Sequence, residues 1–299
     1  MRAHQVSRNA LKVSRALLFA ADDSRRAGLL PPDSAKTTEA LLRAAGMLDD
    51  WQVRVYRSSR LRRLRSWSED KLLPGATTHL ALRKRVMDDE TRSAIEAGAT
   101  QVLVVGAGFD TLGLRLARRY PSVRFVEIDH PATQSLKRHA IAQIGPPDNL
   151  VLHPADLAET SLPEAAEELG WDRDQRAVVT TEGVLRHIAE PDVADFLRGV
   201  SEVMGPGSRL LGTYLLPDAQ GRPQAGRLAG LGRASRRAIG EPMQWAVTRE
   251  DLASLLTEIG FQMRDEPGHV DLRLRYLVPL GLDELPLATV EQILIADLA

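Results

Sequence analysis

The 299-residue sequence contains no cysteine. This absence excludes disulfide bonds, thiolate metal sites and a cysteine nucleophile, and it is compatible with a reducing cytosol. The 39 basic and 40 acidic residues nearly balance, so the formal net charge of -1 creates no overall field for nucleic acid or an anionic membrane. We therefore expect neither a nucleic-acid partner nor a membrane partner.

Long apolar runs are also missing at the N-terminus. The run "ALLFAA" at residues 16–21 is followed directly by two aspartates. It is too short for a membrane span or for the apolar region of a signal peptide, so we expect a cytoplasmic protein. With 43% hydrophobic and 26% charged residues, the composition is typical of a folded globular enzyme.

Several catalytic signatures are absent as well. The sequence has no Gly-x-Ser-x-Gly turn and no Gly-Lys-Ser/Thr phosphate loop, which argues against a hydrolase and an NTPase. The histidines show no His-Glu-x-x-His spacing, so we expect no metal site.

Residues 1–75 are predicted to form a helical N-terminal segment, because apolar residues recur at helical spacing over 8–48. The stretch "GLLPPDS" interrupts this pattern. Gly28 can end one helix there, and Asp33 or Ser34 can cap the next.

Six arginines follow between residues 54 and 65. The favoured interpretation is a solvated helix face with Val55, Leu61 and Leu64 turned inward. An arginine-rich face that steers an anionic substrate is the alternative.

Residues 76–299 alternate between strand-like and helix-like stretches. The strand-like stretches are "TQVLVVG", "VRFVEID", "NLVLHPAD", "RAVVTTEG", "SRLLGTYLL" and "RLRYLVPL". Amphipathic stretches separate them: "DTLGLRLARRY", "ATQSLKRHAIAQIG", "PDVADFLRGVSEVMG" and "TREDLASLLTEIG". This alternation predicts an α/β fold with a doubly wound, largely parallel sheet. Residues 217–247, rich in glycine, proline and arginine, are predicted to be a lid-like insertion.

The stretch "GAGFD" follows the first predicted strand, where an open parallel sheet binds its ligands. Gly106 permits a sharp turn out of the strand, and Gly108 lets the backbone approach a ligand. Asp129 ends the second predicted strand, where a carboxylate can accept hydrogen bonds from a ribose, and Glu127 is a second candidate for that role.

The helix after the glycines favours a methyl donor over NAD. A dinucleotide fingerprint places Gly or Ala where this sequence has Thr111. Asp110 at the start of the helix would repel a pyrophosphate but suit a cation or an amino group. The stretch therefore favours S-adenosylmethionine, whose sulfonium and amino groups are positive.

"GAGFDT", "FVEIDHPATQSLK" and "TTEGVLRHI", in this order, resemble the leucine carboxyl methyltransferase family of class I S-adenosylmethionine-dependent methyltransferases, including its bacterial small-molecule members. "RKRVMDD" resembles the Arg-x-Arg-x-x-Asp-Asp segment of this family. The similarity spans roughly residues 79–190, and we assign none to residues 1–75 or 217–247. It implies a seven-stranded, Rossmann-like domain.

The resemblance also implies roles for individual residues around the methionyl part of the donor. Arg83 is expected to hold the carboxylate of the donor by a charge-assisted pair. The loop around the methionyl part would consist of Gly106, Ala107, Gly108 and Asp110.

Further roles follow for the remainder of the donor. Asp129 is expected to bind the ribose, and Asp156 with Leu157 to contact adenine. Glu182 would face the amino group of the donor or the transferred methyl group.

Two groups of residues keep alternative interpretations. Arg85, Asp88 and Asp89 belong to the family-like segment but could equally form a surface ion-pair cluster. His187 stands where the family often has Tyr, beside Arg186 in place of an apolar residue. His187 is therefore either a general base near the acceptor or a wall of the pocket.

The sequence as a whole favours an O-methyltransferase that acts on a carboxylate or hydroxyl of a small, natural-product-like acceptor. A carboxylate is already ionised at pH 7, whereas a phenol with a pKa near 10 would be helped by a base. An inactive donor-binding partner or sensor protein is the main alternative, and an NAD-dependent oxidoreductase is a more distant one. A homodimer is among the assemblies that the sequence allows.

Overall fold

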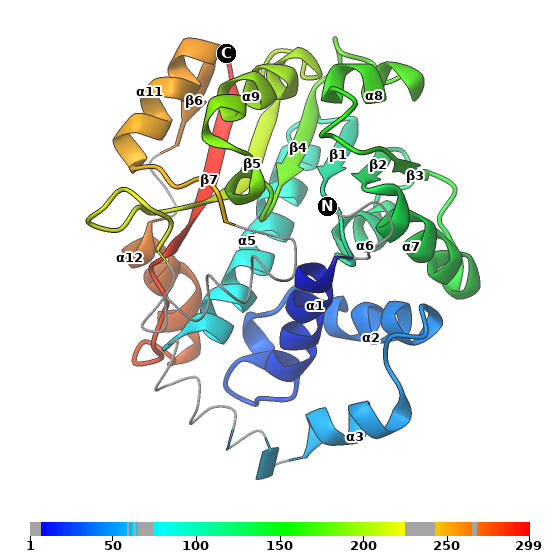
Figure 1. The fold of residues 1–299 in the computed structure, drawn as a ribbon. Helices are drawn as coiled ribbons and strands as arrows, with labels where there is room; N and C mark the ends of the chain where they lie inside the picture. The colour runs from blue at the N-terminus through cyan, green and yellow to red at the C-terminus, as the bar shows by residue number, and fades with distance from the viewer. Residues whose placement is uncertain (1–6, 59, 62–63, 65–73, 225–242, 265–267) are drawn as a thin grey trace.

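The structure is a computed structural model that describes residues 7–58, 60–61, 64, 74–224, 243–264 and 268–299. A seven-stranded sheet runs through its centre, with helices on both faces (Figure 1). The predicted α/β fold with a doubly wound, mostly parallel sheet is confirmed.

The strands are short and rich in β-branched residues. In chain order they are β1 (Gln101–Val105), β2 (Arg124–Asp129), β3 (Leu150–Pro154), β4 (Ala177–Thr181), β5 (Arg209–Leu215), β6 (Phe261–Met263) and β7 (Glu291–Leu298). Their order in the sheet is β3-β2-β1-β4-β5-β7-β6, and β7 alone runs antiparallel to its neighbours β5 and β6. The direction of winding reverses between β1 and β4, where ligands of such sheets bind.

The α-helices of the described residues are α1 (Arg8–Ala21), α2 (Ser34–Ala44), α3 (Asp50–Arg57), α5 (Ala76–Glu96), α6 (Leu112–Arg119), α7 (Pro131–Ile144), α8 (Leu162–Glu168), α9 (Val193–Glu202), α11 (Arg249–Ile259) and α12 (His269–Leu272). The four amphipathic stretches predicted as helices form α6, α7, α9 and α11, which confirms those predictions. Local signals explain two of their ends: Pro131 opens α7, and Gly260 closes α11 with a positive φ of 102°.

Two apolar layers fix the helices on the sheet. On one face, α8, α9 and α11 bury side chains such as Leu197 and Leu256 against β1, β4 and β5. On the other face, α5 and α6 bury Leu82 and Leu116, and α1 adds Leu17 to the same cluster. The N-terminal helices therefore pack into the core of the sheet domain (Figure 1).

The boundaries inside the N-terminal segment differ from the prediction. Helix α1 ends at Ala21, before Gly28, which lies in a short 3-10 turn (Ala27–Leu29). Asp33 occupies the N-cap position of α2 with a φ of 59°, but its side chain makes no capping hydrogen bond. Ser34 instead donates its hydroxyl to the Pro31 carbonyl at 2.7 Å.

The inward orientation predicted for three apolar residues of the arginine-rich stretch is wrong. Val55, Leu61 and Leu64 are 40%, 43% and 60% exposed. Helix α3 instead buries Val53, and a residue two positions further lies roughly 200° around the helix, on its opposite side. Positions 59, 62–63 and 65 of this stretch lie outside the described residues.

The strand predicted at "RLRYLVPL" is also wrong. Residues Arg273–Leu277 form a π-helical turn and Val278–Leu280 a 3-10 turn. Leu272 and Leu277 are buried there, whereas Leu274 and Val278 are exposed, which is a helical pattern. The last strands of the sheet are β6 and β7 instead.

The predicted insertion is described only at its two ends. Residues 217–224 form a turn closed by a bridge between Pro217 and Pro223, and 225–242 lie outside the described residues. No helix in the described part of the chain is long and apolar enough to cross a membrane.

Candidate functional site

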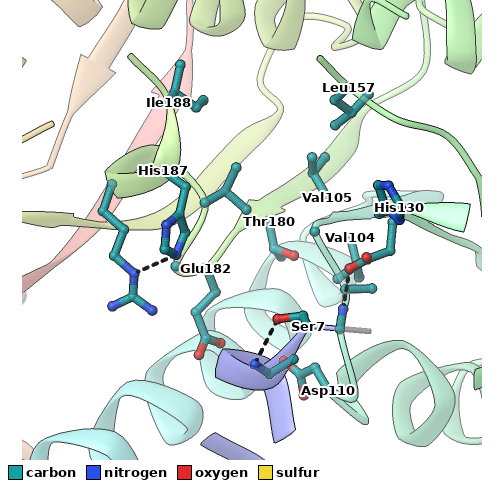
Figure 2. Close-up of a pocket in the computed structure, with 18 of the residues that line it drawn as sticks. Ser7, Val104, Val105, Asp110, His130, Leu157, Thr180, Glu182, His187 and Ile188 are labelled. Atoms are coloured by element: carbon teal, nitrogen blue, oxygen red, sulfur yellow. Dashed lines mark hydrogen bonds between the residues drawn. The ribbon is translucent and has the colours of Figure 1, made fainter. Parts of the chain in front are cut away.

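A cavity of about 840 Å³ opens at the carboxyl ends of β1, β2, β3 and β4. Its walls include the glycine loop after β1, the turn after β4 and the first half of α1. Figure 2 shows Asp110 and Glu182 near Ser7, the residue that caps α1, with Leu157 and Ile188 at the far end of the pocket. The cavity thus lies where the winding of the sheet reverses.

The loop after β1 depends on two glycines with a left-handed backbone. Gly106 and Gly108 have φ values of 66° and 50°, which side chains rarely allow. A Cβ on Gly106 would lie 2.6 Å from Val184 Cγ2, and one on Gly108 only 2.8 Å from Ala10 Cβ. The close approach at Gly108 is therefore made by α1 of the protein itself.

Asp129 at the end of β2 lies in the cavity wall, as expected of a ligand-binding acid. Its Oδ2 accepts a 2.6 Å hydrogen bond from the Gly108 amide, so the acid also fixes the glycine loop. Burial raises the pKa of Asp129, although the Gly108 amide and Lys137 oppose this effect.

Glu127 does not lie in the cavity wall, which corrects its assignment as a second ribose-binding candidate. It is completely buried, and its Oε2 lies 2.5 Å from Nζ of the equally buried Lys137. Its Oε1 lies under Gly113, where an added Cβ would come within 2.5 Å. Because side chains alternate along a strand, Glu127 and Asp129 share one face of β2, but Glu127 sits two residues deeper, under α6.

Asp110 lies at the start of α6 and uses its two oxygens differently. Its Oδ1 accepts hydrogen bonds from the amides of Thr111 and Leu112, at 2.5 and 3.1 Å. Its Oδ2 lies 2.8 Å from Lys84 Nζ. The amides that would hold a pyrophosphate at this helix start are thus already used. Burial disfavours the ionised form, but Lys84 and Lys137 outweigh it and hold the pKa of Asp110 well below its usual range.

Glu182, directly after β4, meets two cations from α5. Its Oε1 lies 2.8 Å from both Arg83 Nε and Lys84 Nζ. Its Oε2 is buried, and no described residue gives it a hydrogen-bond partner. Buried polar atoms are normally satisfied, so this oxygen is a point where a ligand donor group fits.

Glu291, at the start of β7, closes the other side of this ion-pair network. It pairs with Arg83 at 2.5 Å and with Arg186 at 3.1 Å, and it accepts a hydrogen bond from the Thr213 hydroxyl. Burial alone would raise the pKa of Glu291, but the two arginines outweigh it and hold the pKa far below its usual range.

The far end of the cavity contains the residues expected to contact adenine. Asp156 and Leu157 both line the wall there, after β3. Asp156 Oδ1 accepts the Ala158 amide at 3.1 Å, and its Oδ2 lies 3.5 Å from Nε2 of His130. Leu157, with Ile188 from the opposite wall, makes this end apolar (Figure 2).

The turn after Glu182 places His187 in the cavity wall. Its Nε2 accepts a 3.3 Å hydrogen bond from Arg186 Nε. The end of the insertion packs on this turn: the amide of Gln244 donates to the Arg186 carbonyl, and its side chain donates to the His187 carbonyl. Gln244 is therefore part of the wall, which the sequence did not predict.

The residues Arg85, Asp88 and Asp89 form ion pairs outside the cavity wall. Arg85 pairs with Asp89 at 2.9 Å, while Asp88 pairs with Arg92 and Arg115 at 3.0 and 2.5 Å. Of the two interpretations of this group, the structure supports the ion-pair cluster.

The structure brings together nearly all residues predicted for the site and adds others. Within the described residues the cavity wall contains Arg83, Gly106, Ala107, Gly108, Asp110, Asp129, Asp156, Leu157, Glu182 and His187. The sequence reasoning missed Lys84, although it lies in "RKRVMDD", and it missed Ser7, which caps α1, and Ser14 on α1.

Comparison with known structures places this architecture in a class. A structure from Thermobifida fusca described as a "putative methyltransferase" has a TM-score of 0.54 and 21% identity, over 87% of this chain and 93% of that one. A DUF574 family protein from Streptomyces avermitilis has a TM-score of 0.57 and 16% identity, over 89% and 99%. The protein has the Rossmann-like fold of class I methyltransferases.

Residues 19–201 match the leucine carboxyl methyltransferase family, which is more than half of the sequence, so the chain belongs to this family. The match begins inside α1, earlier than the motifs indicated. A "putative S-adenosyl-L-methionine-dependent methyltransferase" of Parafrankia sp. is 29% identical over 60% of this chain and 62% of its own length. One of Mycobacterium tuberculosis is 31% identical over 45% and 44%. The chain thus spans less than two thirds of the length of these relatives.

Proposed function

We propose that the protein is an S-adenosylmethionine-dependent methyltransferase that methylates an oxygen of a small-molecule acceptor. The observation that carries the proposal is the buried Oε2 of Glu182, which lacks a partner among the described residues and lies in the wall beside the glycine loop. An ammonium group is the donor that such a carboxylate oxygen prefers. The names of the Parafrankia and Mycobacterium relatives support the same activity.

The described residues fit the parts of this cofactor in sequence along the cavity. Glu182 would receive its amino group and Arg83 its carboxylate, while Asp129 would receive the ribose hydroxyls. The apolar Leu157 and the carboxylate of Asp156 suit the adenine. When bound, the cofactor supplies an electrophilic methyl group on a sulfonium.

NAD fits the same cavity poorly. The amides at the start of α6 already bind Asp110 Oδ1, and Thr111 stands in place of the third glycine of a dinucleotide fingerprint. With these two amides engaged and the Asp110 carboxylate beside them, the helix start is unfavourable for a pyrophosphate.

The protein contributes alignment and exclusion of water to the transfer. Helix α1 reaches the glycine loop at Ala10, and Gln244 closes the wall beside His187. We propose that the described parts of the N-terminal segment and of the insertion, α1 and Gln244 among them, cover the acceptor; the rest of the insertion, 225–242, lies outside the described residues.

The position of His187 bears on the acceptor. Its Nε2 already accepts a hydrogen bond from the Arg186 guanidinium, so this nitrogen is engaged within the protein. This supports His187 as a wall of the pocket and an acceptor that needs no base, such as a carboxylate.

Calorimetric titration with S-adenosylhomocysteine, and separately with NADH, tests the donor. We expect micromolar binding of S-adenosylhomocysteine alone. Asp129→Asn should weaken it by about 1–3 kcal/mol, because hydrogen bonds to a charged acceptor are lost, whereas the exposed Asp174→Asn should leave it unchanged. Binding of NADH, or of neither ligand, would overturn the proposal.

Turnover of a panel of small carboxylic acids and phenols tests the acceptor. If the acceptor is a carboxylate, His187→Phe should keep its activity and its pH–rate profile. A phenol methyltransferase would be slowed, with the loss of a limb of the profile near neutral pH. Donor binding without turnover of any acceptor would instead favour the inactive partner or sensor.

A further inference from the structure

Lys84 is a buried lysine of the cavity wall to which neither the sequence motifs nor the comparisons give a role. It lies on α5 between Arg83 and Arg85, and its side chain is only 10% exposed. Its Nζ lies 2.8 Å from Asp110 Oδ2 and 2.8 Å from Glu182 Oε1. One ammonium group therefore joins the loop after β1 to the end of β4.

This contact determines which oxygen of Glu182 is left for a ligand. Arg83 and Lys84 both approach Oε1, while Oε2 stays buried without a partner among the described residues. The second oxygen of Asp110 is held by the amides at the start of α6. Lys84 thus fixes both carboxylates through one oxygen each.

We propose that Lys84 is a positioning residue for donor binding: it holds Asp110 and Glu182 side by side as carboxylates, so that Glu182 Oε2 faces the amino group of the donor. This inference rests on the proposed methyltransferase function. It does not require Lys84 to touch the donor.

The charges around Glu182 explain why donor binding would depend on Lys84. Glu182 pairs with Arg83 and Lys84 from α5. Lys84 links it to Asp110, on which Lys137 and Arg115 also act, and Arg83 links it to Glu291, which is paired with Arg186 and His79 as well. Without Lys84, Asp110 and Glu182 lose the cation that they share. Two neighbouring carboxylates in a buried site then tend to hold one proton between them, and a protonated Glu182 binds an ammonium group poorly.

The test compares two ligands and four proteins by calorimetry between pH 5.5 and 9. S-adenosylhomocysteine has the amino acid part, and 5′-methylthioadenosine has the same nucleoside without it. The proteins are wild type, Lys84→Met, Lys84→Arg and a surface control, Lys36→Met, which lies on α2 outside this cavity. Lys84→Gln, a neutral residue that can still donate hydrogen bonds, replaces Lys84→Met if that variant does not fold.

We expect Lys84→Met to bind S-adenosylhomocysteine at least about tenfold more weakly at pH 6 and to recover most of this loss by pH 9, as the shared proton leaves. Its affinity for 5′-methylthioadenosine should stay within about twofold of wild type, and Lys84→Arg should restore the wild-type profile. The other charged groups of the site are the same in all variants, so the difference between profiles isolates Lys84.

Three results would overturn the inference. One is an unchanged affinity of Lys84→Met for S-adenosylhomocysteine, and another is an equal loss for both ligands, which would indicate a general structural defect. A loss that does not depend on pH would indicate direct contact with the donor instead. If wild type itself fails to bind S-adenosylhomocysteine, the proposed function fails and not this inference alone.

Discussion

Two carboxylates, Glu90 within α5 and Glu182 after the central strand β4, have similar surroundings and different consequences. Glu90, on α5, is 5% exposed and meets three arginines: Arg275 at Oε1, and Arg209 and Arg264 at Oε2. Glu182, beyond the carboxyl end of β4, is similarly buried and meets Arg83 and Lys84. Both are buried acids surrounded by cations.

The difference lies in the second oxygen. Both oxygens of Glu90 have partners within the protein, whereas among the described residues Glu182 has partners at Oε1 only. Glu182 also lies in the cavity wall, and Glu90 does not. Removing an acid whose two oxygens both have protein partners, such as Glu90, is thus expected to affect folding. Removing an acid with one oxygen left for a ligand, such as Glu182, is expected to affect ligand binding.

The largest effect is expected for Glu182→Gln. Loss of the charge that faces the amino group should cost about 2–5 kcal/mol of binding, or at least about a 30-fold weaker affinity for S-adenosylhomocysteine. Calorimetry measures this change. The same substitution at Glu90 is the matched control, and an equal loss of affinity in both variants would contradict the comparison.

Glu90→Gln should act on stability instead. Removing the charge of a buried acid that has three arginine partners should lower the free energy of unfolding by about 3 kcal/mol, although Arg209 keeps Asp297 as a partner. Urea denaturation monitored by circular dichroism measures this quantity. Affinity for S-adenosylhomocysteine should stay within about twofold, and a stable Glu90→Gln protein with impaired binding would reverse the roles assigned to the two acids.

His79, on α5, lies 3.8 Å from Glu291 and tests whether the ion-pair network of Glu291 makes the stability of the protein sensitive to pH. Burial lowers the pKa of this histidine to about 4, and Glu291 only partly opposes the effect. Because the unfolded chain has a pKa near 6.5, it binds the proton more readily than the fold, so stability falls as the pH drops below about 6.5. Between pH 6.5 and 5 the loss should be about 2 kcal/mol. His79→Gln should show a clearly smaller loss in urea denaturation over this range; an equal loss would mean that other groups cause it.

A substitution at Gly108 tests the close contact between the glycine loop and α1, and not the charges of the site. Gly108→Ala should destabilise the protein by about 1–2 kcal/mol, because its φ is positive and the added Cβ would meet Ala10. Ala10→Gly should relieve the part of this cost that comes from the contact, which a double-mutant cycle in thermal unfolding measures. Additive effects would show that α1 does not press on the loop as the structure indicates.

The periodicity of the sequence predicted β1 to β5 and the four amphipathic helices between strands, because both depend on local spacing and on residues such as Pro131 and Gly260. It misassigned "RLRYLVPL", since a short apolar run with few polar residues fits a strand and a helical turn equally well. The inward orientation of Val55 failed because a helical pattern does not say which face finds a partner.

The site was predictable in its motif residues and not in its contacts. Glu127 and Asp129 are both acids near the end of one strand. Glu127 is inaccessible to a ligand because α6 packs over it and Lys137 pairs with it. The part of α1 in the cavity wall lies about a hundred residues before the glycine loop, so no local pattern connects them.

By itself, the sequence determined the alternation of strands and helices, the glycine loop and the acids at the strand ends, because these follow from local conformational preferences and spacing. Only the tertiary structure decided that Lys84 joins Asp110 to Glu182, that Ala10 covers Gly108 and that Glu182 Oε2 remains without a partner among the described residues. These contacts join segments far apart in the chain, and burial and charge at such contacts depend on how the elements pack.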